Sequence, residues 1–275
     1  MDTLNPGIST SSIQSQLGNA KAPLLIDVRR QAAFDADTQM IAGATWRDPF
    51  AIADWAKFMP RHREVVVYCV HGHEISKNAA AALASTGISA RYLEGGIEGW
   101  RASDGVLCNK QPSLNIPSAT NHPSVWVTRA RPKIDRIACP WLIRRFIDPL
   151  AEFLYVPSTD VMTVAAEKNA IPYDVPGVQF THRGDACSFD ALIADFALSD
   201  PALNELAKIV RGADTGAPEL TPQSPGLLAV SLGLSALYAD DHEMLAQGMI
   251  VYDALYAWLK SARAEIHNAD LFKKS

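Results

Sequence analysis

A cysteine at the end of a short apolar segment is the residue of this sequence best placed to do chemistry. Cys69 closes EVVVYC (64–69), a loop with Gly72 follows, and an Ala-rich helix is expected to begin near Ser76. Backbone N–H groups of such a loop and helix start point at the sulfur and stabilise its thiolate. The thiolate is the form that attacks sulfur donors, and the same groups would hold an anionic persulfide. The alternative is a purely packing role, because free cysteine is among the most buried residue types.

The side chains between Cys69 and the helix decide which sulfur donor the loop would accept. The Glu74 carboxylate disfavours both a thiolate and an anionic donor. His71 and His73 restore positive charge if they are protonated, although loop histidines are more often only solvated. The candidate catalytic residues are therefore Cys69, His71, Gly72, His73 and Glu74.

A second group of residues suited to chemistry lies in the second half of the chain. Guanidinium groups near a helix N-terminus can together bind a tetrahedral dianion. The candidate oxyanion-binding residues are basic side chains at two expected strand ends and just before an expected helix: Arg129, Arg131, Arg136, His182 and Arg183. The alternative is that the arginines form surface ion pairs with nearby carboxylates, namely Asp135, Asp148 and Asp185.

The same region offers a competing metal site. Imidazole and carboxylate ligands from separate elements suit zinc, iron or manganese. The candidate divalent-metal ligands are His182, Asp185, Asp241 and His242. The sequence contains no H-x3-H or C-x2-C pair, and Asp241 is equally explained as a favourable charge in a helix's first turn. Cys139 and Cys187 lie near expected helix starts, where we expect them to pack rather than react.

The elements around Cys69 predict an α/β unit with a mainly parallel sheet flanked by helices. Three apolar runs are typical of buried strands: 24–28, 64–69 and 90–93. Segments 49–58 and 76–86 between them have helical spacing. This unit is expected to occupy residues 1–107, and a Pro-rich linker without periodicity follows at 108–123.

Residues 124–275 predict a second α/β domain that ends in long helices. Strands are expected at 124–129, 152–156 and 178–182, and a helix from Cys139-Pro140, since proline suits the first helical position. Ser188 and Asp200 are expected to cap two further helices. The pattern from 224 to 266 predicts two helices that are broken near Tyr238–Asp241.

Composition narrows the functional classes. Hydrophobic residues make up 48% and charged residues 20% of the chain, as in ordinary globular proteins. We expect a soluble cytoplasmic protein with no membrane partner, because the sequence lacks a long apolar run, a secretion signal and paired cysteine spacing. The net charge of −5 argues against nucleic-acid binding, although a local arginine cluster leaves a small anion open.

Four segments of the first half resemble a single-domain rhodanese in order and spacing. They are LLIDVR, IAGA, VVVYCVHGHEIS and YLEGGIEGWRASDGV, and the resemblance covers roughly residues 10–107. It implies a sulfurtransferase in which Cys69 carries the sulfur. Phosphatases on the same fold use C-x5-R, and Ile75 occupies that arginine position here. The sequence departs from many rhodaneses at Glu74, where they have arginine.

Segments of the second half resemble the C-terminal domain of the chromate-resistance protein ChrB family. They are WVTRARPKIDRIACPWLIRRFIDP, FTHRGDACSFD, IVRGADT and YADDHEMLAQGMIVYDALYAWLK, within about 124–262. The resemblance implies chromate sensing or resistance. The regulators of that family carry a different N-terminal domain for DNA, so DNA binding is not expected here.

Together the two resemblances predict a sulfurtransferase that uses a Cys69 persulfide and a small-molecule sulfur donor. They also imply that this sulfurtransferase is coupled to a domain that responds to an oxyanion such as chromate. The alternative is a non-catalytic oxyanion- or metal-sensing protein in which Cys69 is a regulatory thiol.

Overall fold

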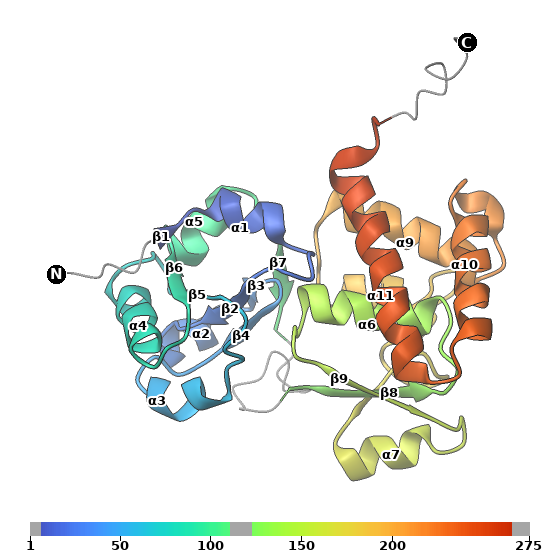
Figure 1. Cartoon of the computed structure of the whole chain (residues 1–275), viewed down its shortest axis with the longest axis horizontal. Coiled ribbons are helices and arrows are strands. Elements are labelled where there is room, and N and C mark those ends of the chain that lie inside the picture. The colour runs from blue at the N-terminus through green and yellow to red at the C-terminus, as the bar shows by residue number, and fades with distance from the viewer. Residues whose placement is uncertain (1–6, 111–122, 266–275) are drawn as a thin grey trace, which may run out of the picture.

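A five-stranded parallel sheet forms the centre of the first half of the molecule (Figure 1). The structure is a computed structural model that describes residues 7–110 and 123–265. The strands lie in the order β1 (Gly7–Ile8), β6 (Ala90–Leu93), β5 (Val65–Tyr68), β2 (Leu24–Asp27) and β4 (Ala44–Trp46). The helices are α1 (Thr10–Gln16), α2 (Gln31–Ala36), α3 (Ile52–Trp55), α4 (Glu74–Ser85) and α5 (Gly96–Ala102). The predicted strands and the predicted parallel sheet flanked by helices are confirmed.

Both faces of this sheet are buried, which explains why its strands are apolar throughout. Leu24 and Val65 face a core shared with α3 and α4, whereas Leu25 and Val66 face a core shared with α1 and α5. Parallel sheets covered on both faces have such continuous apolar runs. The carboxyl ends of β2 and β5 are thereby fixed side by side, and Cys69 follows β5 directly.

A three-stranded parallel sheet begins the second half, in the order β10 (Ile171–Pro172), β8 (Val125–Arg129), β9 (Glu152–Val156). Helix α7 (Val161–Lys168) covers one face through Val127, Val161 and Ala165. The helices on the opposite side are α6 (Asp135–Phe146), α8 (Ser188–Asp195), α9 (Pro201–Asp214), α10 (Ser224–Leu237) and α11 (Asp241–Ala257) (Figure 1). The predicted break between the two last helices and the Asp200 cap of α9 are confirmed.

Three predicted elements of this half are wrong in detail. Helix α6 begins at Asp135 rather than at Cys139, so that Pro140 lies inside it. Proline has no N–H to donate to the carbonyl four residues earlier. That carbonyl, on Arg136, instead accepts hydrogen bonds of 3.4 Å from the hydroxyls of Tyr155 and Tyr173. The tertiary structure therefore satisfies the group that proline would have left unpaired.

The other two corrections concern the segment before α8. Cys187 occupies the N-cap position, where Ser188 was expected, and Ser188 is the first helical residue. No strand forms at residues 178–182, where Phe180 makes one isolated β-bridge with Tyr173. His182 therefore lies in a loop rather than at a strand end.

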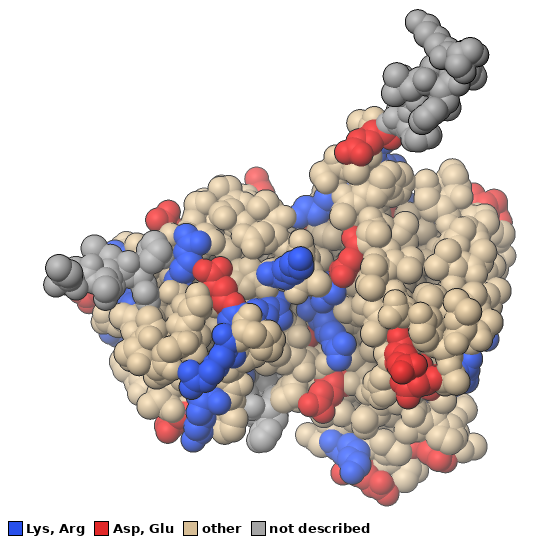
Figure 2. Space-filling model, in the orientation of Figure 1, with Lys and Arg blue, Asp and Glu red and all other residues tan. Residues whose placement is uncertain are grey.

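The two halves share one hydrophobic core. Trp100 of the first half and Phe146 of the second belong to the same buried cluster, and Gly43 N donates to Phe146 O at 2.7 Å. Strand β7 (Leu107–Asn109) pairs with β3 (Gln39–Ile41), so the predicted linker begins inside a strand, and most of it lies outside the described residues. Figure 2 shows basic side chains gathered along the boundary between the halves on the visible face. Within the described residues, no helix is long and apolar enough to cross a membrane.

Candidate functional site

The loop after β5 is held in place by the start of α5. The backbone N–H groups of Ile97 and Glu98 donate to the carbonyls of Cys69 and Val70 at 3.0 and 3.1 Å. Gly72 has a φ of +71°, and a Cβ on it would lie 2.6 Å from the Leu93 carbonyl. The approach of these backbones explains why glycines occur both in the loop and in the segment that opens α5.

Cys69 lies at the bottom of this loop with a stabilised thiolate. Its Sγ is 3.3 Å from the Ser76 hydroxyl, and the residue is 5% exposed. Burial by itself raises the pKa of the thiol. Hydrogen bonds from the Ser76 hydroxyl and from the backbone N–H groups of Ser76, His73 and His71 outweigh burial and lower the pKa below its usual value. The loop thus favours the nucleophilic form of Cys69.

A cavity of about 620 Å³ opens above Cys69 and brings the predicted catalytic side chains together. His71, His73 and Glu74 line it, and Gly72 shapes the loop beside it. Three further cations line the cavity and were not among the predicted site residues: Arg29, Arg30 and Lys77. Among the described residues that line the cavity, Glu74 is the one carboxylate, and the cations Arg30 and Lys77 accompany it.

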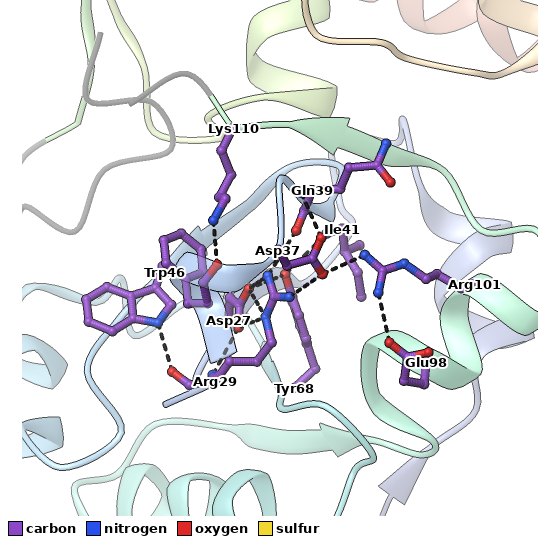
Figure 3. Close-up of polar contacts among 11 residues, drawn as sticks. Asp27, Arg29, Asp37, Gln39, Ile41, Trp46, Tyr68, Glu98, Arg101 and Lys110 are labelled. Atoms are coloured by element: carbon purple, nitrogen blue, oxygen red, sulfur yellow. Dashed lines mark hydrogen bonds and ion pairs between the residues drawn. The ribbon is translucent and has the colours of Figure 1, made fainter. Parts of the chain in front are cut away.

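A buried ion-pair network surrounds Arg29, a residue that lines the cavity (Figure 3). Arg29 Nε and Nη2 donate to the Asp27 carboxylate at 2.7–3.0 Å, and Arg29 Nη1 donates to Asp37 at 2.7 Å. The Tyr68 hydroxyl donates to Asp27 at 3.1 Å. Tyr68 directly precedes Cys69, so the network fixes the residue from which the loop departs.

A second cluster of ionisable side chains occurs in the second half. His182 Nε2 lies 3.1 Å from Asp214, 3.5 Å from Asp174 and 3.6 Å from Asp135. Asp135 is 1% exposed and accepts hydrogen bonds from the backbone N–H groups of Ser188 and Phe189, the first two residues of α8. Burial, followed by the charges of Asp214 and Asp174, raises the pKa of Asp135 well above its usual value. The cluster therefore gathers three carboxyl groups around one imidazole.

Two of the predicted oxyanion-binding arginines lie next to this cluster. Arg129 Nη2 and Arg136 Nε lie 3.2 and 3.3 Å from the same oxygen of Asp174. A cavity of about 430 Å³ opens beside them, and Arg129, Asp174 and His182 line it. Arg129 Nε is buried without a hydrogen-bond partner among the described residues. The structure thus brings Arg129, Arg136 and His182 to one place.

The other predicted residues of this half lie elsewhere. Arg131 donates to the carbonyls of Ser235, Tyr238 and Ala239 at the end of α10, and Arg183 pairs with Asp195 at 2.6 Å. Of the predicted metal ligands, His182 alone belongs to the cluster. Asp185 is exposed, Asp241 accepts from the Arg131 N–H, and His242 packs edge-on against Tyr155.

The fold brings several residues to these two sites that were not predicted from the sequence as site residues. They are Ser76, Arg30 and Lys77 near Cys69, and Asp135, Asp174 and Asp214 near His182. Asp135 was considered only as a surface ion-pair partner, and this was wrong because it is buried. Asp135 and Asp214 both lie in segments that carry the ChrB resemblance, which was the available signal.

Both halves match known families. Residues 9–103 match the model of the rhodanese-like domain, and residues 126–259 match that of the C-terminal domain of ChrB. A rhodanese-related protein from Thermoplasma volcanium of known structure is 24% identical with a TM-score of 0.33, covering 37% of this chain and 96% of that one.

Two curated relatives correspond to the two families. The chain is 38% identical over 139 residues to Protein ChrB of Cupriavidus metallidurans, covering 50% of this chain and 41% of that protein. It is 38% identical over 81 residues to the thiosulfate sulfurtransferase GlpE of Pseudomonas fluorescens, covering 29% of this chain and 72% of that protein. The chain thus spans less than half the length of ChrB. It belongs to the rhodanese-like family through its first half and carries a ChrB C-terminal domain in its second.

Proposed function

We propose that the protein is a sulfurtransferase in which Cys69 forms a persulfide. The observation that carries this proposal is the hydrogen-bonded thiolate of Cys69 at the base of a cavity of about 620 Å³. The Cys69 thiolate attacks the outer sulfur of a donor such as thiosulfate, the donor's S–S bond breaks, and sulfite leaves with the bonding electrons. An acceptor nucleophile then takes the outer sulfur and regenerates the thiolate.

The charges around the cavity support an anionic donor. Arg30 and Lys77 are exposed at its lining and offset the carboxylate of Glu74. The loop N–H groups that stabilise the thiolate would equally stabilise the anionic persulfide. Incubation with thiosulfate should therefore add the mass of one sulfur atom to the peptide that contains Cys69. An unmodified peptide after incubation with thiosulfate and with other persulfide donors would overturn the proposal.

Replacement of Glu74 by arginine should raise kcat/KM for thiosulfate. Glu74 is exposed at the cavity, and its charge opposes the approach of a dianion. An exposed charge pair contributes roughly 0.2–1 kcal/mol, and a reversal removes one repulsion and adds one attraction, so kcat/KM should increase about two- to thirtyfold. Steady-state kinetics at low ionic strength measure the effect, and added salt should reduce it.

Glu64→Arg is the matched control, because it changes the net charge equally. Glu64 immediately precedes β5, at the end of that strand opposite to Cys69. Its reversal should leave kcat/KM unchanged. Equal effects of the two variants would attribute the gain to net charge, and no gain in Glu74→Arg would mean that the native donor is not anionic.

For the second half, we propose an oxyanion-binding role, which the resemblance to the ChrB family connects with chromate. The supporting observation is the cavity of about 430 Å³ lined by Arg129 and His182, where Arg129 Nε has no partner among the described residues. Arg136 lies behind it and binds the same Asp174 oxygen as Arg129. Planar guanidinium groups bind tetrahedral oxyanions through paired N–H donors. Sulfate and chromate share this shape and charge.

Sulfate or chromate should raise the Tm of the wild-type protein, and Arg129→Ala should abolish the shift. At about ten times Kd, a ligand of the folded state adds about 1.4 kcal/mol, or roughly 3–5 °C. The Arg129 side chain is 39% exposed, and Arg136 still pairs with Asp174 without it, so its loss should change the unliganded Tm little. Arg183→Ala is the control and should keep the shift, because Arg183 pairs with Asp195 instead. The role is refuted if neither anion shifts the wild-type Tm, with or without added zinc.

A further inference from the structure

Three ligand-type side chains from distant parts of the second half meet at one point. Asp135 begins α6, His182 lies in the loop before α8, and Asp214 ends α9. His182 Nε2 is 3.1 Å from Asp214 Oδ2 and 3.6 Å from Asp135 Oδ2. One ligand atom from each of the three lies within 4.8 Å of the other two.

These spacings fit a single bound cation. Nitrogen and oxygen ligands at roughly 2.0–2.2 Å from one tetrahedral metal lie about 3.3–3.6 Å from each other. A network of hydrogen bonds alone explains the arrangement less well. The Nε2 atom of His182 carries at most one proton, yet the carboxylates of Asp135, Asp174 and Asp214 all lie around it.

Neighbouring groups orient the Asp135 carboxylate, and the nearby arginines pair with Asp174 rather than with Asp135 or Asp214. The N–H groups of Ser188 and Phe189 fix the Asp135 carboxylate from outside the cluster, as outer hydrogen bonds do in metal sites. The nearby arginines, Arg129 and Arg136, bind Asp174 through Oδ2, whereas His182 faces Oδ1. Within the described residues, neither Asp135 nor Asp214 forms an ion pair with an arginine.

We propose that Asp135, His182 and Asp214 bind one divalent cation of the zinc, iron or manganese class. One imidazole and two carboxylates suit these metals. His182 is 41% exposed and lines the cavity of about 430 Å³, so a coordination position faces that cavity. Three protein ligands with one open position are typical of zinc sites that accept an exogenous ligand. The proposal does not depend on Cys69 or on sulfur transfer.

The test is metal stoichiometry after the protein is stripped with chelator and reloaded with Zn(II) or Co(II). Wild-type protein and Cys69→Ser should each bind one equivalent, because Cys69 is not a ligand. Zinc at roughly a hundredfold excess over Kd should raise the Tm by several degrees. Co(II) should give the visible absorption of a low-symmetry site. Asp214→Asn and His182→Ala should lose the bound metal, the Co(II) spectrum and the Tm shift.

Two features keep the result interpretable. His182 is exposed enough for its replacement to leave the fold intact, which circular dichroism of the metal-free variants verifies. His242→Ala is the matched control, since His242 packs on Tyr155 outside the cluster, and it should bind one equivalent. The site is refuted if wild-type protein binds neither metal, or if folded His182→Ala binds as much as wild type.

Discussion

Cys69→Ser is expected to lose sulfurtransferase activity by at least about a thousandfold, down to the background rate. A serine hydroxyl does not ionise near neutral pH and forms no transferable S–S bond with the donor's sulfur. The oxygen retains the position of the sulfur, next to the Ser76 hydroxyl, so the fold should persist. Sulfite release from thiosulfate measures the activity, and mass spectrometry shows whether sulfur is still carried.

Cys108→Ala provides the control for this prediction. Cys108 is fully buried, and burial raises the pKa of its thiol to about 12, so it should not react. The variant should transfer sulfur at nearly the wild-type rate per folded molecule. Full activity in Cys69→Ser would place the sulfur on another residue and end the assignment.

Arg29→Ala is expected to lower the free energy of unfolding by about 3–5 kcal/mol, the range for removal of one partner from a buried ion pair. Asp27 is fully buried, and burial raises the pKa of its carboxyl group. The hydrogen bonds and the charge of Arg29 act in the opposite direction and stabilise the carboxylate. Without Arg29 the buried carboxylate must either stay charged and unpaired or take up a proton. Urea denaturation at neutral pH measures the loss as a lower transition midpoint.

Arg30→Ala is the neighbouring control. Arg30 is exposed, so its removal should change the unfolding free energy by no more than about 0.5 kcal/mol. Asp27→Asn combined with Arg29→Ala should destabilise by less than the sum of the single changes, because the two side chains form one unit. An unchanged midpoint in Arg29→Ala would contradict the role of this network (Figure 3).

The sequence by itself determined the sheet and the reactive cysteine of the first half. Continuous apolar runs at 24–28, 64–69 and 90–93 predicted β2, β5 and β6, because a strand buried on both faces leaves a local signal. The loop of Cys69 could also be predicted from local sequence, because the strand end, the glycine and the helix start are neighbours in the chain. The Ser76 hydroxyl was not predicted as a partner because its direction depends on where α4 begins.

Only the tertiary structure decided the start of α6. Local rules place a proline in the first turn of a helix, and they predicted a start at Cys139. Tyr155 and Tyr173 come from distant segments and satisfy the carbonyl that Pro140 leaves free. Helix α6 can therefore begin at Asp135 and bury that carboxylate against the start of α8.

Tertiary structure likewise decided which polar residues of the second half share a site. Asp135, Asp174, His182 and Asp214 come from segments separated by up to about eighty residues, and no local spacing connects them. Asp185 and His242 carry the right chemical groups, but Asp185 is exposed outside the cluster and His242 packs on Tyr155. The sequence identifies which residues have suitable chemical groups, whereas the packing of the helices around a common core determines which of those side chains lie close together.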